Sequence, residues 1–138
     1  MKKILFSLLL FICVLSSKAQ TDTLSLIQAY NNFNAFEKAE WTSFINDWNY
    51  FDYSKLLKDQ HIKSINCKQC SSLYADVYLE VDNKGKVKKT VFRKGKKCGE
   101  KLSDKATMDW FIQSIEKRSF SSIKNKKFIA RFGHVLKC

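Results

Sequence analysis

Alternating apolar and polar residues predict a β-hairpin in the second half of the chain. One face of residues 72–81 holds Leu73, Ala75, Val77, Leu79 and Val81, and the other holds Tyr74, Asp76, Tyr78 and Glu80. Residues 82–85 read Asp-Asn-Lys-Gly, a turn signal in which Gly85 supplies the positive φ of a tight turn. We therefore expect a half-buried strand, a turn and a returning strand over residues 86–93.

A helix and a third strand are predicted downstream of the hairpin. Ser103 is placed to cap the start of the helix, and apolar residues recur at three- and four-residue steps after it. This expected buried stripe consists of Met108, Phe111, Ile112 and Ile115. Residues 126–136 then alternate again, with one apolar face made of Phe128, Ala130, Phe132 and Leu136.

The first half of the chain has a helical pattern. Residues 23–38 predict one helix, with its apolar stripe at Leu26, Tyr30, Phe33 and Phe36. A second helix is expected to open at Glu40 or Thr42 and to share one face among Trp41, Phe44, Ile45 and Trp48. A short third turn holds Tyr53, Leu56 and Leu57. Because these rings need an apolar surface to cover, we expect this helical layer to pack on the sheet.

The order hairpin, helix, strand restricts the topology. A crossover helix places the second and third strands parallel, so the simplest sheet has the first strand between them, antiparallel to both. The sequence therefore predicts an α+β fold. Its sheet is three-stranded and antiparallel, in the order 2-1-3, with a crossover helix and a preceding aromatic-rich helical layer. In this order the second strand and the C-terminal strand are both edges.

Length and composition indicate one globular domain behind a cleavable leader. The chain has 138 residues, of which 45% are apolar and none is proline, which excludes Pro-rich spacers and a disordered tail. A basic pair at residues 2–3, an apolar run over residues 4–15 and small residues at 17 and 19 are typical of a bacterial signal peptide. That run spans about 18 Å as a helix, too short for a bilayer core of about 30 Å. We expect residues 1–19 to be removed, and a domain without a transmembrane segment to be exported to the periplasm or the medium.

Charge divides the expected domain, residues 20–138, into two parts. Residues 20–60, the helical layer, carry three Lys and six acidic residues, a net charge of −3, whereas residues 61–138 carry 19 basic and seven acidic residues, a net charge of +12. The hairpin holds a basic patch of Lys84, Lys86, Lys88, Lys89, Arg93, Lys94, Lys96 and Lys97. Such a patch attracts polyanions such as an anionic envelope component, although lysines also protect an exposed strand from aggregation. Nucleic acid is not the expected partner, because Phe92 is the only aromatic ring on the basic strand.

Residues 74–138 contain an ordered series of short motifs. An alternating strand at residues 74–81 leads into Asp-Asn-Lys-Gly-Lys-Val at 82–87, Leu102 opens the helix, and Arg-Ser-Phe at 118–120 precedes the final strand. This series resembles the TonB C-terminal domain family. The chain departs from the family's pattern at 121–122, where two serines replace an acidic residue and a proline, and it has no Pro-rich spacer. The resemblance implies a β-β-α-β unit that binds proteins and does not transmit force from the inner membrane.

Four cysteines follow the leader, at Cys67, Cys70, Cys98 and Cys138. The 2-1-3 sheet brings all four to one end, and four cysteines in an exported chain indicate two disulfides. The convergent pairings are Cys67 with Cys98 and Cys70 with Cys138, or Cys67 with Cys138 and Cys70 with Cys98. A Cys67–Cys70 bridge would instead leave Cys98 with Cys138. A zinc site and a redox motif are the competing hypotheses, but zinc ligands usually come in two pairs and a redox Cys-x-x-Cys precedes a helix.

The sequence shows no catalytic constellation, and we expect neither an enzyme nor a cofactor. The two histidines are isolated from each other. Asp76 and Glu80 share a strand face at a separation of about 13 Å, too far for the carboxylate pair of a glycosidase. They are better placed to pair with Lys86 and Lys88 across the hairpin.

A binding function is therefore expected, and three hypotheses are ranked. The first is protein binding, in which an extended peptide adds to the C-terminal edge strand at Phe128, Ile129, Arg131, Gly133 and Val135. The second is binding of a polyanion or of the envelope surface by the basic hairpin. The third is thiol–disulfide chemistry. Salt separates the first two, because polyanion affinity falls steeply with ionic strength.

Overall fold

A computed structural model describes residues 24–138 of the chain. The predicted signal peptide, residues 1–19, and the predicted start at residue 20 lie outside the described residues. In the described part, no helix combines the length and the apolar character that are needed to cross a membrane.

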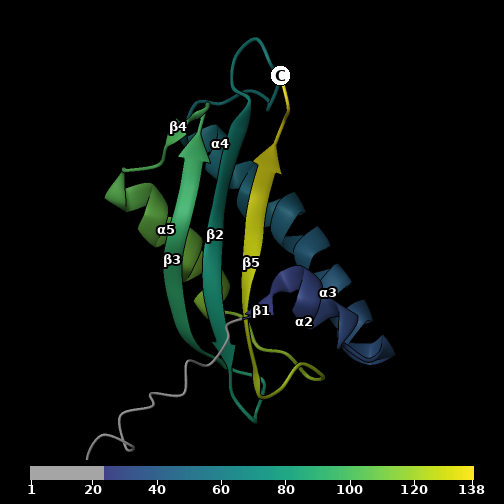
Figure 1. Ribbon diagram of the computed structural model, residues 1–138. Helices are drawn as coiled ribbons and strands as arrows, with labels where there is room; N and C mark the ends of the chain where they lie inside the picture. The colour runs from purple at the N-terminus through teal and green to yellow at the C-terminus, as the bar shows by residue number, and fades with distance from the viewer. Residues whose placement is uncertain (1–23) are drawn as a thin grey trace, which may run out of the picture.

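A five-stranded sheet in the order β1-β5-β2-β3-β4 forms the frame of the molecule. Its long strands are β2 (Ser72–Val81), β3 (Val87–Lys97) and β5 (Lys126–Val135), and its short edge strands are β1 (Leu24–Ser25) and β4 (Glu100–Lys101). The sheet curls, and α3, α4 and α5 lie against one side of it (Figure 1). We call that side the core face and the opposite side the outer face.

The long strands have the predicted order, with β2 in the centre and antiparallel to both neighbours. The prediction of a three-stranded, purely antiparallel sheet is wrong, because two short strands extend the sheet. β1 pairs in parallel with Phe128 and Ile129 of β5, and β4 pairs with Lys96 and Lys97 of β3. A strand of two residues contains no alternation, so its pattern cannot reveal it.

The hairpin turn has the predicted form. Gly85 has φ +81°, and a Cβ on it would lie 1.7 Å from the carbonyl oxygen of Phe120. The carboxylate of Asp82 accepts hydrogen bonds of 2.8 Å from the backbone N–H groups of Lys84 and Lys86. The turn is therefore held by the hydrogen bonds of Asp82 within it and by its close contact with Phe120 in the segment that follows α5.

The helical layer contains α2 (Leu26–Asn31), α3 (Ala35–Asp47), the π-helical η1 (Trp48–Tyr53) and α4 (Ser54–Asp59). The predicted helix over residues 23–38 is divided, because Asn34 caps a new helix. Its side chain accepts from the N–H of Glu37, whose carboxylate accepts from the N–H of Asn34. α3 buries the stripe of Glu37, Trp41 and Phe44, which leaves Phe36 78% exposed rather than buried as predicted. The predicted second and third helical pieces are one continuous run from Ala35.

Aromatic rings of this layer fill the space over the core face. Trp41 packs edge-on against Phe128 and Phe132 of β5, with ring centroids 5.3 and 6.2 Å apart. Trp48 is fully buried and donates its indole N–H to Oγ of Ser114 at 3.0 Å. The predicted role of the aromatic layer as the cover of the sheet is confirmed.

The crossover helix is α5 (Lys105–Glu116), and it buries Phe111 and Ile115 of the predicted stripe. Its N-cap is Asp104 rather than the predicted Ser103. The Asp104 carboxylate accepts from two backbone N–H groups of the first turn. A negative charge at a helix N-terminus also interacts favourably with the helix dipole, which gives the aspartate an advantage over its serine neighbour.

Tyr53 links the helical layer to the sheet. Its hydroxyl donates to the carbonyl oxygen of Leu73 in β2 at 2.8 Å and accepts from the N–H of His134 in β5 at 3.3 Å. Gly133 has φ +92°, and a Cβ there would lie 2.2 Å from that carbonyl oxygen. Leu136 follows the last residue of β5 and is 40% exposed, so the prediction that it belongs to the buried face is wrong.

Two disulfides close one end of the sheet, the end to which the predicted strand order brings all four cysteines. They join Cys67 with Cys138 and Cys70 with Cys98, the second of the two convergent pairings. The Cα–Cα distances are 5.6 and 4.3 Å. Two disulfides are typical of proteins that fold in an oxidising compartment.

Candidate binding surface

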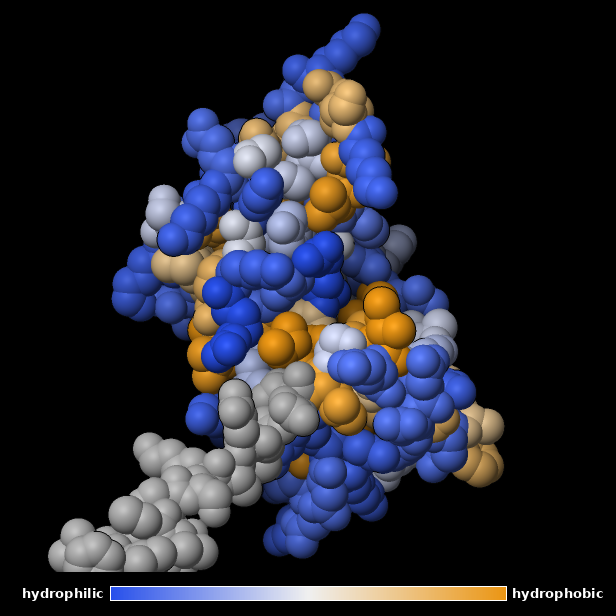
Figure 2. Space-filling view, viewed as in Figure 1, coloured by the Kyte–Doolittle hydropathy of each residue, from blue (hydrophilic) through white to orange (hydrophobic). Residues whose placement is uncertain are grey.

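Residues of three strands stand in rows across the outer face. From β3 through β2 to β5, the register gives the rows Lys96–Tyr74–Gly133, Lys94–Asp76–Arg131, Val91–Tyr78–Ile129 and Lys89–Glu80–Lys127. Figure 2 shows hydrophilic residues across the middle of this face and an apolar patch directly below them. In two of the rows an acidic residue on the central strand therefore lies between cations on the outer strands.

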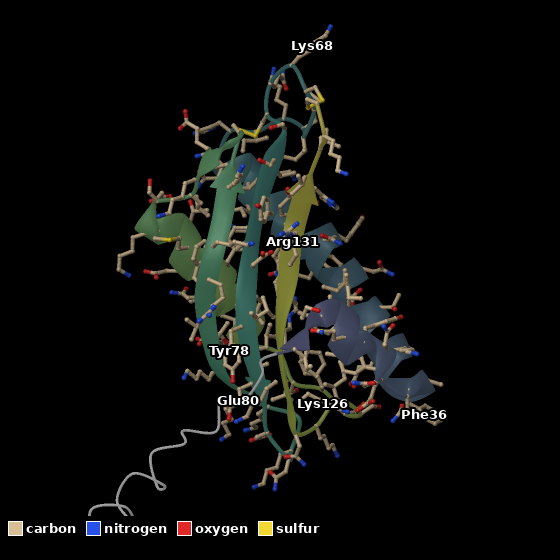
Figure 3. The ribbon with its side chains drawn as sticks, viewed as in Figure 1. Phe36, Lys68, Tyr78, Glu80, Lys126 and Arg131 are labelled. Carbon is tan, nitrogen blue, oxygen red and sulfur yellow. A yellow bond between two sulfur atoms is a disulfide. The ribbon has the colours of Figure 1, made fainter. Side chains whose placement is uncertain are left out.

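Asp76 is the centre of the more buried row. It is 8% exposed and accepts two hydrogen bonds from Arg131, from Nε at 2.6 Å and from Nη2 at 2.9 Å. Lys94 Nζ lies 3.5 Å from the same carboxylate, and the guanidinium stands 4.4 Å from the ring centroid of Tyr74. The hydrogen bond to Asp76 raises the pKa of Arg131. The guanidinium is therefore held in a fixed orientation on the outer face (Figure 3).

Glu80 is the centre of the second charged row. Lys127 Nζ lies 3.3 Å from its carboxylate, and the hydroxyl of Tyr78 donates to it at 3.2 Å. Burial and the nearby charge of Glu80 raise the pKa of Tyr78. The predicted pairing of Asp76 and Glu80 with Lys86 and Lys88 is not what the structure shows. A register shift after Glu80 moves Lys88 out of the ladder, and it pairs with Asp82 instead, at 3.5 Å.

The predicted basic patch is exposed, and its members lie partly on the outer face and partly at the hairpin turn. All of its members are exposed except the half-buried Lys97, whose Nζ donates to Oε1 of Gln60 at 2.5 Å. Lys89, Lys94 and Lys96 stand in the rows of the outer face, whereas Lys84 and Lys86 lie at the hairpin turn.

The predicted edge strand is partly covered. β1 pairs with it only at Phe128 and Ile129, and the side chain of Phe128 is fully buried in the core. The N–H of Leu136 donates to the carbonyl oxygen of Ser71 at 2.7 Å, and inward-facing N–H groups alternate along an antiparallel ladder. The N–H groups of Ile129 and Arg131 therefore point away from β2. In the described part of the chain no strand lies beside β5 from residue 130 to residue 135.

Part of this surface can be predicted from the sequence. Alternation places Asp76 on the polar face of its strand, and it places Arg131 on the strand face opposite to that of the buried Phe132. In the 2-1-3 order these two polar faces are adjacent, so the pattern favours a pair between Asp76 and Arg131. No sequence pattern predicts that residues 24–25 pair with β5.

Comparisons with known proteins assign no family. No family model, no curated protein and no solved structure matches the chain. The resemblance to TonB C-terminal domains stays a prediction. Within residues 24–138, no cluster of three or more His, Cys, Asp or Glu side chains is placed to hold a metal ion. The two features that bear on function are the charged outer face and the part of β5, residues 130–135, that has no neighbouring strand in the described part of the chain.

Proposed function

We propose that the protein is an exported, non-catalytic binding module that adds an extended segment of a partner protein to the edge of β5. The observation that carries this proposal is the short reach of β1. It ends at Ser25, so residues 130–135 of β5 have no neighbouring strand among the residues that the structure describes. An edge of this kind offers unpaired N–H and C=O groups to another chain.

β5 is a well-supported template for strand addition. It pairs with β2 along its whole length, and its side chains Phe128, Ala130 and Phe132 are buried in the core. The opposite edge differs, because β4 covers the end of β3 and many lysines line the rest. Lysines on an edge discourage strand pairing, so β5 is the edge better suited to a partner.

Two further features support the proposal. The resemblance to TonB C-terminal domains implies protein binding by an edge strand. The two disulfides fit a protein exported to the periplasm or the medium, where such bonds persist.

A pair of variants at one position tests strand addition. Arg131→Pro removes the outward N–H and the side chain, whereas Arg131→Ala removes the side chain alone. Random peptides of about eight residues would be displayed and selected on the unmodified protein. We expect the selected peptides to bind Arg131→Pro about tenfold more weakly than Arg131→Ala, because strand addition needs that donor.

The matched pair also gives the contradicting result. Both variants should keep the unmodified protein's circular dichroism spectrum, since the ladder to β2 does not use the N–H of Arg131. Equal peptide affinity for the two folded variants, or a selection that enriches no peptide, would reject strand addition at β5.

Polyanion binding is the second candidate, and the exposure of the basic patch favours it. Only Lys88 and Lys94 of the patch form ion pairs among residues 24–138, at 3.5 Å each. A polyanion such as heparin would then bind with an affinity that falls steeply between low and high salt. Loss of binding in Lys89→Glu/Lys96→Glu, together with unchanged binding in Arg131→Pro, would select this function over strand addition.

A further inference from the structure

A groove crosses the outer face and reaches the edge of β5 where β1 ends. Its volume is about 720 Å³, and it is lined by Ser25, Leu26, Ile27, Gln28, Asp76, Arg93, Lys94, Ile129 and Arg131. The start of α2 forms one wall, β3 forms the other, and Asp76, Ile129 and Arg131 form the floor. A strand added to β5 after the point where β1 ends, from residue 130 onward, would therefore place its outer-face side chains at the mouth of this groove.

The groove contains more positive than negative charge. Among the described residues that line it, three cations, Arg93, Lys94 and Arg131, accompany one carboxylate, that of Asp76, which leaves an excess of two positive charges. Arg131 uses Nε and Nη2 for Asp76, and Nη1 takes no part in that pair. Arg93 makes no ion pair with any residue that the structure describes. A guanidinium that is fixed by one carboxylate is well oriented to bind a second one.

A second copy of the chain is a poor occupant of this site. The groove's excess positive charge would face the same excess on the copy, and residues 61–138 as a whole carry a net charge of +12. Like charges that face each other across an interface are costly. The charge is complementary to an acidic segment instead.

From this arrangement we infer that the strand-adding partner is an acidic segment. Its Glu or Asp side chain enters the groove and binds Arg131 and Arg93 beside Lys94. The inference rests on the proposed function, because strand addition at β5 is what brings the carboxylate to the groove. The charged groove would give specificity for an acidic partner, whereas the backbone groups of the edge would pair with any extended chain.

The test uses the selected peptides and their uncharged counterparts, in which each Glu becomes Gln and each Asp becomes Asn. We expect the selected peptides to be acidic, and the uncharged forms to bind the unmodified protein about tenfold more weakly. Arg131→Ala should reduce this preference to about twofold or less. Arg93→Ala should also reduce it, and this exposed residue can be replaced without leaving Asp76 short of a partner. Lys124→Ala, an exposed cation outside the groove, is the matched control and should keep the full preference.

The possible outcomes separate this inference from the proposed function. Binding that is sensitive to Arg131→Pro but shows no acidic preference would reject the acidic partner and keep strand addition. An acidic preference with equal affinity for Arg131→Pro and Arg131→Ala would reject strand addition, and with it the inference. A concentration-dependent dimer in sedimentation would identify a second copy as the occupant and overturn the inference.

Discussion

At the scale of single residues, Glu40 joins α3 to the segment that follows α5. Its carboxylate accepts from the N–H groups of Ser121, Ser122 and Ile123 at 2.5, 2.8 and 3.1 Å, and from the hydroxyl of Ser121 at 2.8 Å. Burial acts to raise the pKa of Glu40, but these hydrogen bonds outweigh it and lower the pKa below the ordinary value of 4.5. The charged carboxylate is therefore the form that stabilises the fold.

Glu40→Gln tests this linkage. A lowered pKa gives stability that is fully present above pH 4.5 and is lost as the pH falls through the lower, folded-state value. At pH 7 we expect the variant to lose about 1 kcal/mol, since hydrogen bonds to a charged group are strong but this one is partly solvated. Urea titrations from pH 7 down to pH 3 should show the difference shrinking. A difference that stays constant over this range would contradict the assignment.

At the scale of elements, the sequence predicts long periodic elements well and short or interrupted ones poorly. β2 and α5 have uninterrupted patterns, and both form where they are predicted. The apolar stripe over residues 23–38 continues through Asn34, so periodicity alone predicts one helix, although the cap at Asn34 starts a second one. β1 has two residues and is defined by its pairing with β5, which is information that a local pattern does not contain. The same limit applies to the candidate site. The extent of β1 determines which part of β5 lacks a neighbouring strand, so the sequence pattern does not predict that part.

The contact between η1 and the sheet leads to a prediction about Tyr53. Tyr53→Phe removes the hydroxyl that bridges Leu73 and His134. Leaving the buried carbonyl of Leu73 and the partly buried N–H of His134 without this partner should cost about 2 kcal/mol of unfolding free energy. Tyr50→Phe is the matched control, because Tyr50 is 74% exposed, and it should change stability by less than about 0.5 kcal/mol. Urea unfolding at pH 7 compares the two variants, and equal losses would show that the bridge does not stabilise the sheet.

High pH gives a second measurement on the same residue. Burial raises the pKa of Tyr53 from 10.0 to about 12, against the opposing effect of the hydrogen bond from His134. Its contribution to stability is therefore present below pH 10 and is lost as the pH rises towards 12. The stability gap between the unmodified protein and Tyr53→Phe should close over this interval.

At the scale of the whole molecule, two ion pairs connect the acidic helical layer to the basic part of the chain. Asp52 of the helical layer pairs with Arg118 at 2.5 Å, and Glu37 pairs with Lys126 at 3.2 Å. Both pairs join the acidic layer to the basic part of the chain that the sequence distinguishes. Lysines of the basic patch are exposed on the outer face and at the hairpin turn, where the proposed acidic partner would bind.

The two disulfides close the same end of the sheet, but only one of them involves the segment that follows β5, the proposed binding strand. Cys138 follows β5 by three residues and is bonded to Cys67, whereas Cys70 and Cys98 tie the start of β2 to the end of β3. In the chain-entropy model, loops of 71 and 28 residues stabilise the fold by about 4.4 and 3.6 kcal/mol, so both matter for stability. Of the two disulfides, only the Cys67–Cys138 bond restrains the end of β5 to which we propose that a partner strand adds.

Removal of each bond should therefore have a different effect on binding. Cys67→Ala/Cys138→Ala frees the end of β5, so we expect the affinity for the selected peptides to fall about fivefold, because fraying template groups must be ordered again on binding. Cys70→Ala/Cys98→Ala is the matched control, and it should lower the urea midpoint while leaving affinity within about twofold. Both are measured by calorimetry well below their melting temperatures, where each variant is folded. If peptide affinity is unchanged in the first variant, or falls equally in both, the peptide does not depend on the end of β5 that Cys138 holds.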